Sequence, residues 1–189
     1  IEFFKVDGGA MFGVVPKLLW SRCSQADDKN LVALSLRSLV VETGGHVVLI
    51  DAGWGDKQDE KFFKFVYQFG GEGLIKGLAG IGYKPEDITD VFFTHLHADH
   101  CGGALRRGPG GVEHVFPNAK YLVSRQQWEW AVKGNLREAD SFLPENILPL
   151  GEGDRLRLVE TDGELFPGFE ARICEGHTPG LMYAVVDYM

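Results

Sequence analysis

The spacing of apolar residues predicts paired strands early in the chain and strands alternating with helices after them. Residues 34–42 and 46–50 form one predicted pair, because residues 43–45 between them have the composition of a hairpin turn. This order of elements predicts a mixed α/β sandwich, of the α+β kind, and not a doubly wound parallel sheet. The other predicted strands cover residues 2–6, 91–93, 120–123, 155–159, 169–175 and 182–187, with 155–159 and 169–175 as a second pair.

Three segments have the apolar spacing of helices. In residues 57–69, phenylalanines and a valine recur at helical intervals between charged residues, and residues 72–79 continue as a shorter helix. Ser124 predicts the start of a third helix, because Gln127 stands three residues later, as in a capping box. We expect that helix to end near Gly134.

The segment 7–16 is rich in glycine and yet apolar, so we expect it to pack against another part of the molecule. Either it covers the core of the domain, or it forms a wall of a substrate pocket, since such pockets are mostly apolar. In the second case, Met11 and Phe12 are the residues that we expect to line the pocket.

Composition limits the classes of protein to consider. The chain of 189 residues fits one domain over residues 1–189, and its 44% apolar and 24% charged residues are ordinary for a globular protein. The net charge of −8 argues against a nucleic-acid partner. No apolar run approaches the roughly 20 residues of a membrane span, and no signal peptide is visible, so we expect a cytoplasmic protein. Its three separated cysteines predict free thiols.

Four good ligands for a divalent metal lie within residues 95–100: three histidines and one aspartate. They follow a predicted buried strand and precede a turn, which is the rigid support that a catalytic site needs. Because alternate residues of an extended segment point the same way, His95 and His97 can reach one metal ion. Asp99 and His100, past the bend, can reach a second.

A third ligand for the first metal has to come from elsewhere, and His177, in the glycine-bounded turn 176–180, is the natural choice. Three protein ligands with one open position are typical of a catalytic metal and not of a structural one. Asp51 follows a fully apolar strand and is either a turn or capping residue or a group that orients a ligand histidine. Cys101 either lies near the metal or is a small turn residue.

Three motifs, in this order, resemble those of the metallo-β-lactamase superfamily. Residues 49–53 resemble its first motif, an aspartate after an apolar strand. Residues 95–100 match its His-x-His-x-Asp-His signature, and residues 176–180 resemble its Gly-His-Thr-x-Gly motif. The resemblance extends from about residue 34 to the end of the chain.

The resemblance implies an αββα sandwich with a metal site at the edge of the sheets. It also implies that His95, His97 and His177 bind one metal ion, with Asp99 and His100 on the other. Two zinc ions are the expected cofactors of the full-length protein. Iron, manganese and cobalt are alternatives, because histidine and carboxylate ligands suit them as well.

The chain departs from the dinuclear members of that superfamily at the second metal. It offers no match for their bridging aspartate, since Asp187 comes too early, or for their last histidine. His114 comes too soon for that role, and we interpret it, like His46, as a loop residue. The predicted second half of the sandwich is also short. We therefore expect the C-terminal part of the fold to lie beyond Met189 and the N-terminus to be trimmed as well.

The expected activity is hydrolysis of an ester, lactone or phosphotriester by a metal-bound hydroxide, with Asp99 as the proton-transfer group. Residues 94–103, 116–121 and 124–128 resemble the branch that holds acyl-homoserine-lactone lactonases and methyl-parathion-type hydrolases. We expect a small apolar substrate, no nucleic-acid or membrane partner, and we leave a homodimer open. One alternative is a glyoxalase II-like thioester hydrolase using the arginines at 106–107. The other is a non-catalytic metal-binding protein.

Overall fold

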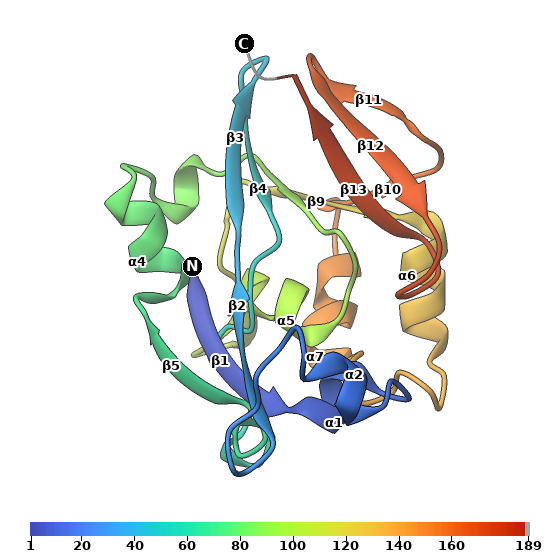
Figure 1. The fold of residues 1–189 in the computed structure, drawn as a ribbon. Coiled ribbons are helices and arrows are strands. Elements are labelled where there is room, and N and C mark those ends of the chain that lie inside the picture. The colour runs from blue at the N-terminus through green and yellow to red at the C-terminus, as the bar shows by residue number, and fades with distance from the viewer. Residues whose placement is uncertain (188–189) are drawn as a thin grey trace.

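Parallel strands form the centre of the molecule. A five-stranded sheet has the order β10-β9-β6-β4-β3, and all its neighbouring strands pair in parallel except β3 and β4 (Figure 1). Its inner strands are almost continuously apolar, because a parallel sheet is buried on both faces. The computed structural model describes residues 1–187. The strands of this sheet span Leu39–Thr43 (β3), His46–Ile50 (β4), Asp90–Phe92 (β6), Lys120–Ser124 (β9) and Leu156–Val159 (β10).

The hairpin of β3 and β4 forms where the sequence predicts it. Gly44 and Gly45 both have positive φ, 54° and 83°, which suits a tight two-residue turn. The single strand predicted over 34–42 is wrong, because the chain forms two strands there, β2 (Leu31–Leu36) and β3. β2 pairs along its whole length with β1 (Glu2–Asp7), so it joins a separate sheet of order β2-β1-β5.

A second, antiparallel sheet packs on one face of the five-stranded sheet. Phe92 and Phe169 lie 5.4 Å apart between ring centroids, inside a buried apolar cluster that both sheets share. The predicted pairing of residues 155–159 with 169–175 is wrong: β10 pairs with β9, and β12 pairs with β11 and β13. Alternation of residues predicts that a strand exists but not which strand it pairs with. The second sheet consists of β11 (Gly163–Phe166), β12 (Phe169–Cys174) and β13 (Leu181–Val186).

Helices cover the opposite face of the five-stranded sheet (Figure 1). The larger buried apolar cluster lies between them and the sheet and includes Val91, Phe93, Tyr121 and Ile147. These helices, the five-stranded sheet and the antiparallel sheet thus form successive layers, which confirms the predicted mixed α/β sandwich, and the sheet β2-β1-β5 is separate from them. The helices on this face are α4 (Gly73–Gly80), α5 (Ala98–Cys101), α6 (Arg125–Lys133) and α7 (Pro144–Ile147).

Helix α6 begins and ends as predicted. The Ser124 hydroxyl accepts a hydrogen bond from the backbone N–H of Gln127 at 3.0 Å, and Gly134 follows the last turn with a φ of 71°. The Gln127 side chain does not complete the capping box, because its amide contacts two loops outside the helix instead.

The helix predicted over residues 57–69 is wrong for most of its length. Only one turn forms, α3 (Glu60–Phe63), and the chain then becomes the strand β5 (Tyr67–Gly71). β5 pairs antiparallel with β1 and so covers its free edge. The spacing of phenylalanines in this segment is compatible with a helix and with a strand, and pairing with β1 favours the strand. As a result Phe65 is 70% exposed and does not belong to the core.

The glycine-rich segment 7–16 contains a short helix, α1 (Gly8–Phe12), and a second one, α2 (Lys17–Trp20), follows it. Asp7 caps α1 by accepting hydrogen bonds from two backbone N–H groups. Gly8 lies against the Trp20 ring, where a Cβ would come within 2.5 Å of the ring. This part of the chain therefore folds back on itself.

The two histidines interpreted as loop residues lie in strands. His46 begins β4 and its Nδ1 is 2.7 Å from Asp90. His114 ends β8 and its Nδ1 is 3.1 Å from the Tyr121 hydroxyl. Among residues 1–187, no helix has both the length and the apolar character to cross a membrane. The remaining elements are β7 (Leu105–Gly108), β8 (Gly111–His114) and the 3-10 turns η1 (Pro85–Asp87), η2 (Gly102–Ala104) and η3 (Leu148–Gly151).

Candidate metal centre

Loops at one edge of the two sheets bring three of the predicted ligands together. β4 and β6 are parallel, so the segments that follow them leave the sheet at the same edge. Met182 N donates to Thr94 O at 2.8 Å, which brings the β12–β13 loop to this edge as well. As a result His95, His97 and His177 each have a ring nitrogen within 4.8 Å of those of the other two.

His95 is buried, and one of its two ring nitrogens, Nε2, is free of protein partners within residues 1–187. The side chain is 3% exposed, and Nε2 has no hydrogen-bond partner among the described residues. Its Nδ1 lies 3.0 Å from the Thr94 hydroxyl, which donates its one proton to Asp51 at 2.8 Å and so accepts from His95. Burial, together with the neighbouring histidines, holds the pKa of His95 far below its ordinary value, so the ring stays neutral.

His97 keeps Nδ1 free, whereas His95 keeps Nε2 free. Its Nε2 is 3.3 Å from the Glu138 carboxylate, and its ring packs 4.8 Å from that of Phe142. Because a carboxylate only accepts, Nε2 carries the proton and Nδ1 keeps its lone pair. Burial lowers the pKa of His97, although the hydrogen bond to Glu138 opposes this. His177 is the exposed member of the three.

Asp99 and His100 lie beside this group and not in it. His100 Nε2 is 3.4 Å from the Asp99 carboxylate, and the His100 ring centroid is 4.0 Å from that of His95. Burial alone would lower the pKa of His100, but Asp51 and Asp99 outweigh it and raise the pKa to about 10. Within residues 1–187, no third His, Cys, Asp or Glu joins this pair to make a second group of three.

Asp51 connects the two sets of ligands. Its Oδ2 accepts from His100 Nδ1 at 2.7 Å and from the Thr94 hydroxyl, and its Oδ1 accepts from Thr94 N at 2.8 Å. Its φ of 56° is unusual for a residue other than glycine, although aspartate tolerates it. Asp51 therefore contacts His100 directly and His95 through Thr94.

The loop that carries the ligands lies directly against the loop that follows β4. Ala52 N donates to His100 O at 2.7 Å. A Cβ at Gly103 would come within 2.0 Å of Ala52 O, so this close approach requires glycine. Lys57 is 2% exposed and donates to the Gly102 carbonyl, and burial lowers its pKa to about 8.

Cys101 belongs to the core behind this loop. Its side chain is fully buried, its thiol donates to Leu96 O at 3.3 Å, and burial raises its pKa to about 12. A thiol that keeps its proton is a poor metal ligand, so the small turn residue is the better interpretation. All three cysteines are free thiols, as predicted.

Met11 and Phe12, the two predicted pocket residues, lie in different surroundings. Met11 lines a cavity of about 190 Å³ together with Asp99 and His100. Phe12 stacks on Trp20 at 4.9 Å between ring centroids, within the folded-back N-terminal segment.

A larger cavity, of about 670 Å³, also reaches Asp99. Its lining includes the apolar side chains of Trp54, Phe62, Val66 and Leu143. The predicted proton-transfer residue therefore borders a chamber of mostly apolar character, which is the usual character of a small-molecule site.

The residues of the three-histidine group fit a divalent metal ion such as zinc. A buried nitrogen without a partner is costly, and His95 Nε2 is such a nitrogen. The rings of His95 and His97 are neutral. Thr94 accepts a hydrogen bond from one nitrogen of His95, Glu138 accepts one from His97, and the second nitrogen of each ring keeps its lone pair. With His177, these histidines supply three nitrogen donors, which is the usual protein ligand number of a catalytic zinc site.

Comparison with known families agrees with this geometry. Residues 35–189 match the model of the metallo-beta-lactamase superfamily. The chain belongs to this superfamily. An N-acyl homoserine lactonase of Bacillus cereus is 27% identical over 168 residues, which are 84% of this chain and 60% of that protein. An N-acyl homoserine lactonase of Agrobacterium fabrum, AttM, is 33% identical over 60 residues, or 32% of this chain and 19% of that protein.

Solved structures place the chain in the same metallo-β-lactamase fold. A probable metal-dependent hydrolase from Staphylococcus aureus has a TM-score of 0.86 and 31% identity, over 100% of this chain and 66% of that one. AidC, a dizinc quorum-quenching lactonase in complex with its product, has a TM-score of 0.76 and 23% identity, over 99% of this chain and 65% of that one. The chain thus spans about two thirds of the length of these two solved structures and 60% of that of the Bacillus cereus lactonase.

Further polar residues, which the sequence does not predict as site residues, contact the candidate ligands or the loops that carry them, among them Thr94, Gln127, Glu138 and Thr178. Thr94 and Thr178 stand next to predicted ligands, so their position in the sequence could have drawn attention to them. The position of Gln127 in the sequence predicts only a role in a helix cap. Glu138 follows α6 in a segment with no motif, and nothing in the sequence near it indicates that it contacts His97.

Proposed function

We propose that this chain provides the metal-binding core of a hydrolase that opens a lactone or a related ester. The observation that carries the proposal is the group of His95, His97 and His177, in which His95 has a buried, unpartnered Nε2. The superfamily membership and the lactonases among the relatives favour a lactone within the wider class of esters and phosphotriesters.

The three histidines would hold the metal ion, and Asp99 and His100 would contribute to a second one. Zinc suits this donor set, and iron, manganese and cobalt remain compatible with it. Bound there, a divalent ion supplies Lewis acidity and lowers the pKa of a water from 15.7 to about 7.

Asp99 is the residue proposed to move the proton. Burial alone would raise the pKa of Asp99, but the hydrogen bond and charge of His100 outweigh it, and the pKa lies below its ordinary value. Its carboxylate is therefore ionised near neutral pH and able to accept a proton from the attacking water and return it to the leaving oxygen. The neighbouring His100 holds that carboxylate at 3.4 Å and limits its orientation.

The cavity of about 670 Å³ beside Asp99 is the proposed substrate chamber. Phe62, Val66 and Leu143 would bind an apolar acyl or alkyl group and exclude water from it. A thioester carrying glutathione carboxylates is less favoured, because both candidate arginines already face carboxylates. Arg106 lies 3.8 Å from Glu113, and Arg107 lies 3.5 Å from Glu145.

The proposal is tested by metal analysis and a substrate panel on the natural protein at its full length. The panel contains an N-acyl homoserine lactone, a simple aryl ester, a phosphotriester and S-lactoylglutathione. We expect bound zinc and the highest kcat/KM on the lactone or ester. Bound metal with no turnover of any of the four substrates would favour the non-catalytic alternative and contradict the proposal. A preference for S-lactoylglutathione would contradict the lactone or ester as substrate and favour a thioester hydrolase.

A further inference from the structure

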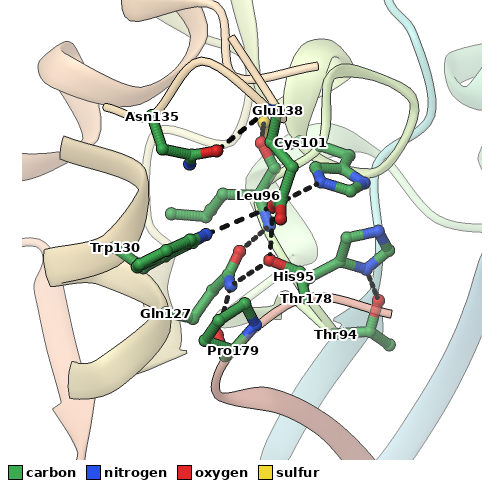
Figure 2. Close-up of polar contacts among 11 residues, drawn as sticks. Thr94, His95, Leu96, Cys101, Gln127, Trp130, Asn135, Glu138, Thr178 and Pro179 are labelled. Atoms are coloured by element: carbon green, nitrogen blue, oxygen red, sulfur yellow. Dashed lines mark hydrogen bonds and ion pairs between the residues drawn. The ribbon is translucent and has the colours of Figure 1, made fainter. Parts of the chain in front are cut away.

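Gln127 joins the two loops that carry the three histidines. Its side chain is fully buried, and its Oε1 accepts from Leu96 N at 3.1 Å (Figure 2). Its Nε2 donates to Pro179 O at 2.6 Å and lies 3.2 Å from the Thr178 hydroxyl. Leu96 stands between His95 and His97 in the sequence, and Thr178 follows His177. One amide at the start of α6 therefore contacts both metal-ligand loops.

Glu138 collects three donors from the same region. Its side chain is 7% exposed, and its Oε2 accepts from the Thr178 hydroxyl at 2.8 Å and from Trp130 Nε1 at 3.3 Å (Figure 2). The third donor is His97 Nε2. The backbone of Glu138 is also fixed, because its N–H donates to Asn135 Oδ1 at 2.9 Å.

The direction of these hydrogen bonds is determined by their chemistry. A carboxylate only accepts, so the Thr178 hydroxyl donates to Glu138. That hydroxyl has no second proton, so it accepts from the Gln127 amide. Gln127 thus donates to Thr178 and Thr178 donates to Glu138, whose carboxylate also accepts from the ring of His97.

We propose that Gln127, Thr178 and Glu138 are positioning residues that set the metal affinity of the three-histidine group. This set, the α6 clamp, holds the His177 loop against the loop of the other two histidines and fixes the proton of His97 on Nε2. Because the clamp consists only of protein groups, it orders the histidines before any metal binds. The inference rests on the metal site of the proposed function.

A purely structural role would give a different result. Buried polar groups that only satisfy one another contribute to the free energy of unfolding, without changing the affinity of a folded protein for metal. Groups that orient a ligand typically change metal affinity or activity by 10–100-fold when they are lost. Metal affinity and the state of the His97 ring are therefore the decisive measurements.

The first test compares Thr178→Val with Thr178→Ser. Valine has nearly the shape of threonine but no hydroxyl, whereas serine keeps the hydroxyl. The measurement is the Kd for Zn²⁺, by competition with a chromophoric chelator, on protein shown to be folded by near-UV circular dichroism. We expect Thr178→Val to weaken zinc binding by about 10-fold or more and Thr178→Ser to stay within about 3-fold of wild type. Equal affinities for valine and wild type would overturn the inference.

The second test uses adjacent glutamines with identical substitutions. Gln127→Met removes the amide that contacts both loops, and Gln126→Met makes the same change at an exposed neighbour for which the structure gives no hydrogen bond. We expect only Gln127→Met to weaken zinc binding. Its effect and that of Thr178→Val should combine to less than the product of the two, because both break one chain of hydrogen bonds. Fully multiplicative effects would contradict a single clamp.

The third test needs no metal. Nitrogen-15 NMR of the imidazoles in the metal-free protein identifies which nitrogen of His97 carries the proton. We expect the Nε2–H form in wild type and a mixture of both forms in Glu138→Gln. An Nδ1–H form in wild type would overturn the inference even if zinc binds tightly. Failure of wild type to bind any divalent metal would instead contradict the proposed function, so the two failures are distinguishable.

Discussion

The two halves of the candidate centre differ in how far the described residues complete them. The three-histidine half has three nitrogen donors within 4.8 Å, and protein groups fix the ring proton of both His95 and His97. The Asp99–His100 half has two donors 3.4 Å apart and no third member among residues 1–187. The first half therefore has the usual number of protein ligands of a catalytic zinc site, and the second has two candidate donors among the described residues.

The halves also rest on different supports. Gln127 and Glu138 brace the three-histidine half from α6 and the segment after it, whereas Asp51 braces His100 from the end of β4. Thr94 belongs to both, because its hydroxyl bonds to Asp51 and His95. The halves can therefore be perturbed separately, except through Thr94 and Asp51.

The largest effect is expected from His97→Ala. This change removes one of the three candidate ligands from the three-histidine half. Loss of a group that only supports a ligand costs up to about 100-fold, so we expect zinc retention and hydrolysis both to fall by more than that. The measurements are zinc content after dialysis and kcat/KM on the preferred substrate. His114→Ala is the matched control, since that histidine lies outside the group. Full activity without bound metal in His97→Ala would contradict the assignment.

Asp99→Asn should separate the halves. We expect hydrolysis to fall by about 100–10,000-fold, the usual range for losing a proton-transfer group, while one zinc per chain remains on the histidines. Zinc content and kcat measured on the same preparation give the comparison. Loss of all zinc from Asp99→Asn would show that the halves are not independent.

A smaller effect concerns the pH dependence of stability near Lys57, which supports the loop of the Asp99–His100 half through Gly102. Its pKa falls from 10.5 to about 8 on burial. Above about pH 8 the folded chain has lost this proton and the unfolded chain keeps it, so the contribution of Lys57 to the free energy of unfolding rises with pH, by at most about 1.4 kcal/mol per unit.

The useful window lies between pH 8 and 9. Above pH 9 the Cys101 thiol, whose pKa rises from 9.0 to about 12, changes stability in the opposite direction. His100, whose pKa rises from 6.5 to about 10, contributes a negative slope in this window to wild type and variant alike. Urea unfolding at several pH values should therefore give a slope for wild type that is more positive than the slope for Lys57→Met. The same slope in both proteins would mean that Lys57 is not the group responsible.

The smallest effect is expected from the two N-terminal pocket predictions. Phe12→Ala removes a stacked pair with Trp20 and should lower the free energy of unfolding by about 1 kcal/mol. Met11→Ala removes a 42%-exposed side chain and should change stability less, while altering KM, because it lines the cavity of Asp99 and His100. A change in KM for Phe12→Ala but not for Met11→Ala would mean that Phe12, and not Met11, lines the substrate site.

The sequence predicts which three candidate ligands lie together better than it predicts the residues that support them. Motif residues such as His95 and His177 are identifiable because their chemistry is unusual in a packing role. Strands of continuous apolar residues, such as β4, are identifiable for a similar reason. Glu138 has neither kind of signal, since its contact with His97 depends on how the chain after α6 turns back toward the site.

Predictions failed where a partner far away in the sequence decides the structure. The spacing of aromatic residues in 57–69 fits a helix, but β1 offers an edge that Tyr67–Gly71 occupies as a strand. Likewise 155–159 and 169–175 are both strands, and each finds its partner in a different sheet. Local patterns carry no information about these choices.

The close approach at Gly102 and Gly103 limits how this site can be moved or redesigned. A Cβ at either position would come within 2.1 Å of a carbonyl oxygen of the 52–54 segment, so the two segments form one interlocked unit. A peptide of residues 95–103, or the same motif grafted onto another scaffold, would lack the backbone that shapes it. Transplanting the centre requires residues 51–57 together with the histidine loop, and mutant libraries should leave both glycines unchanged.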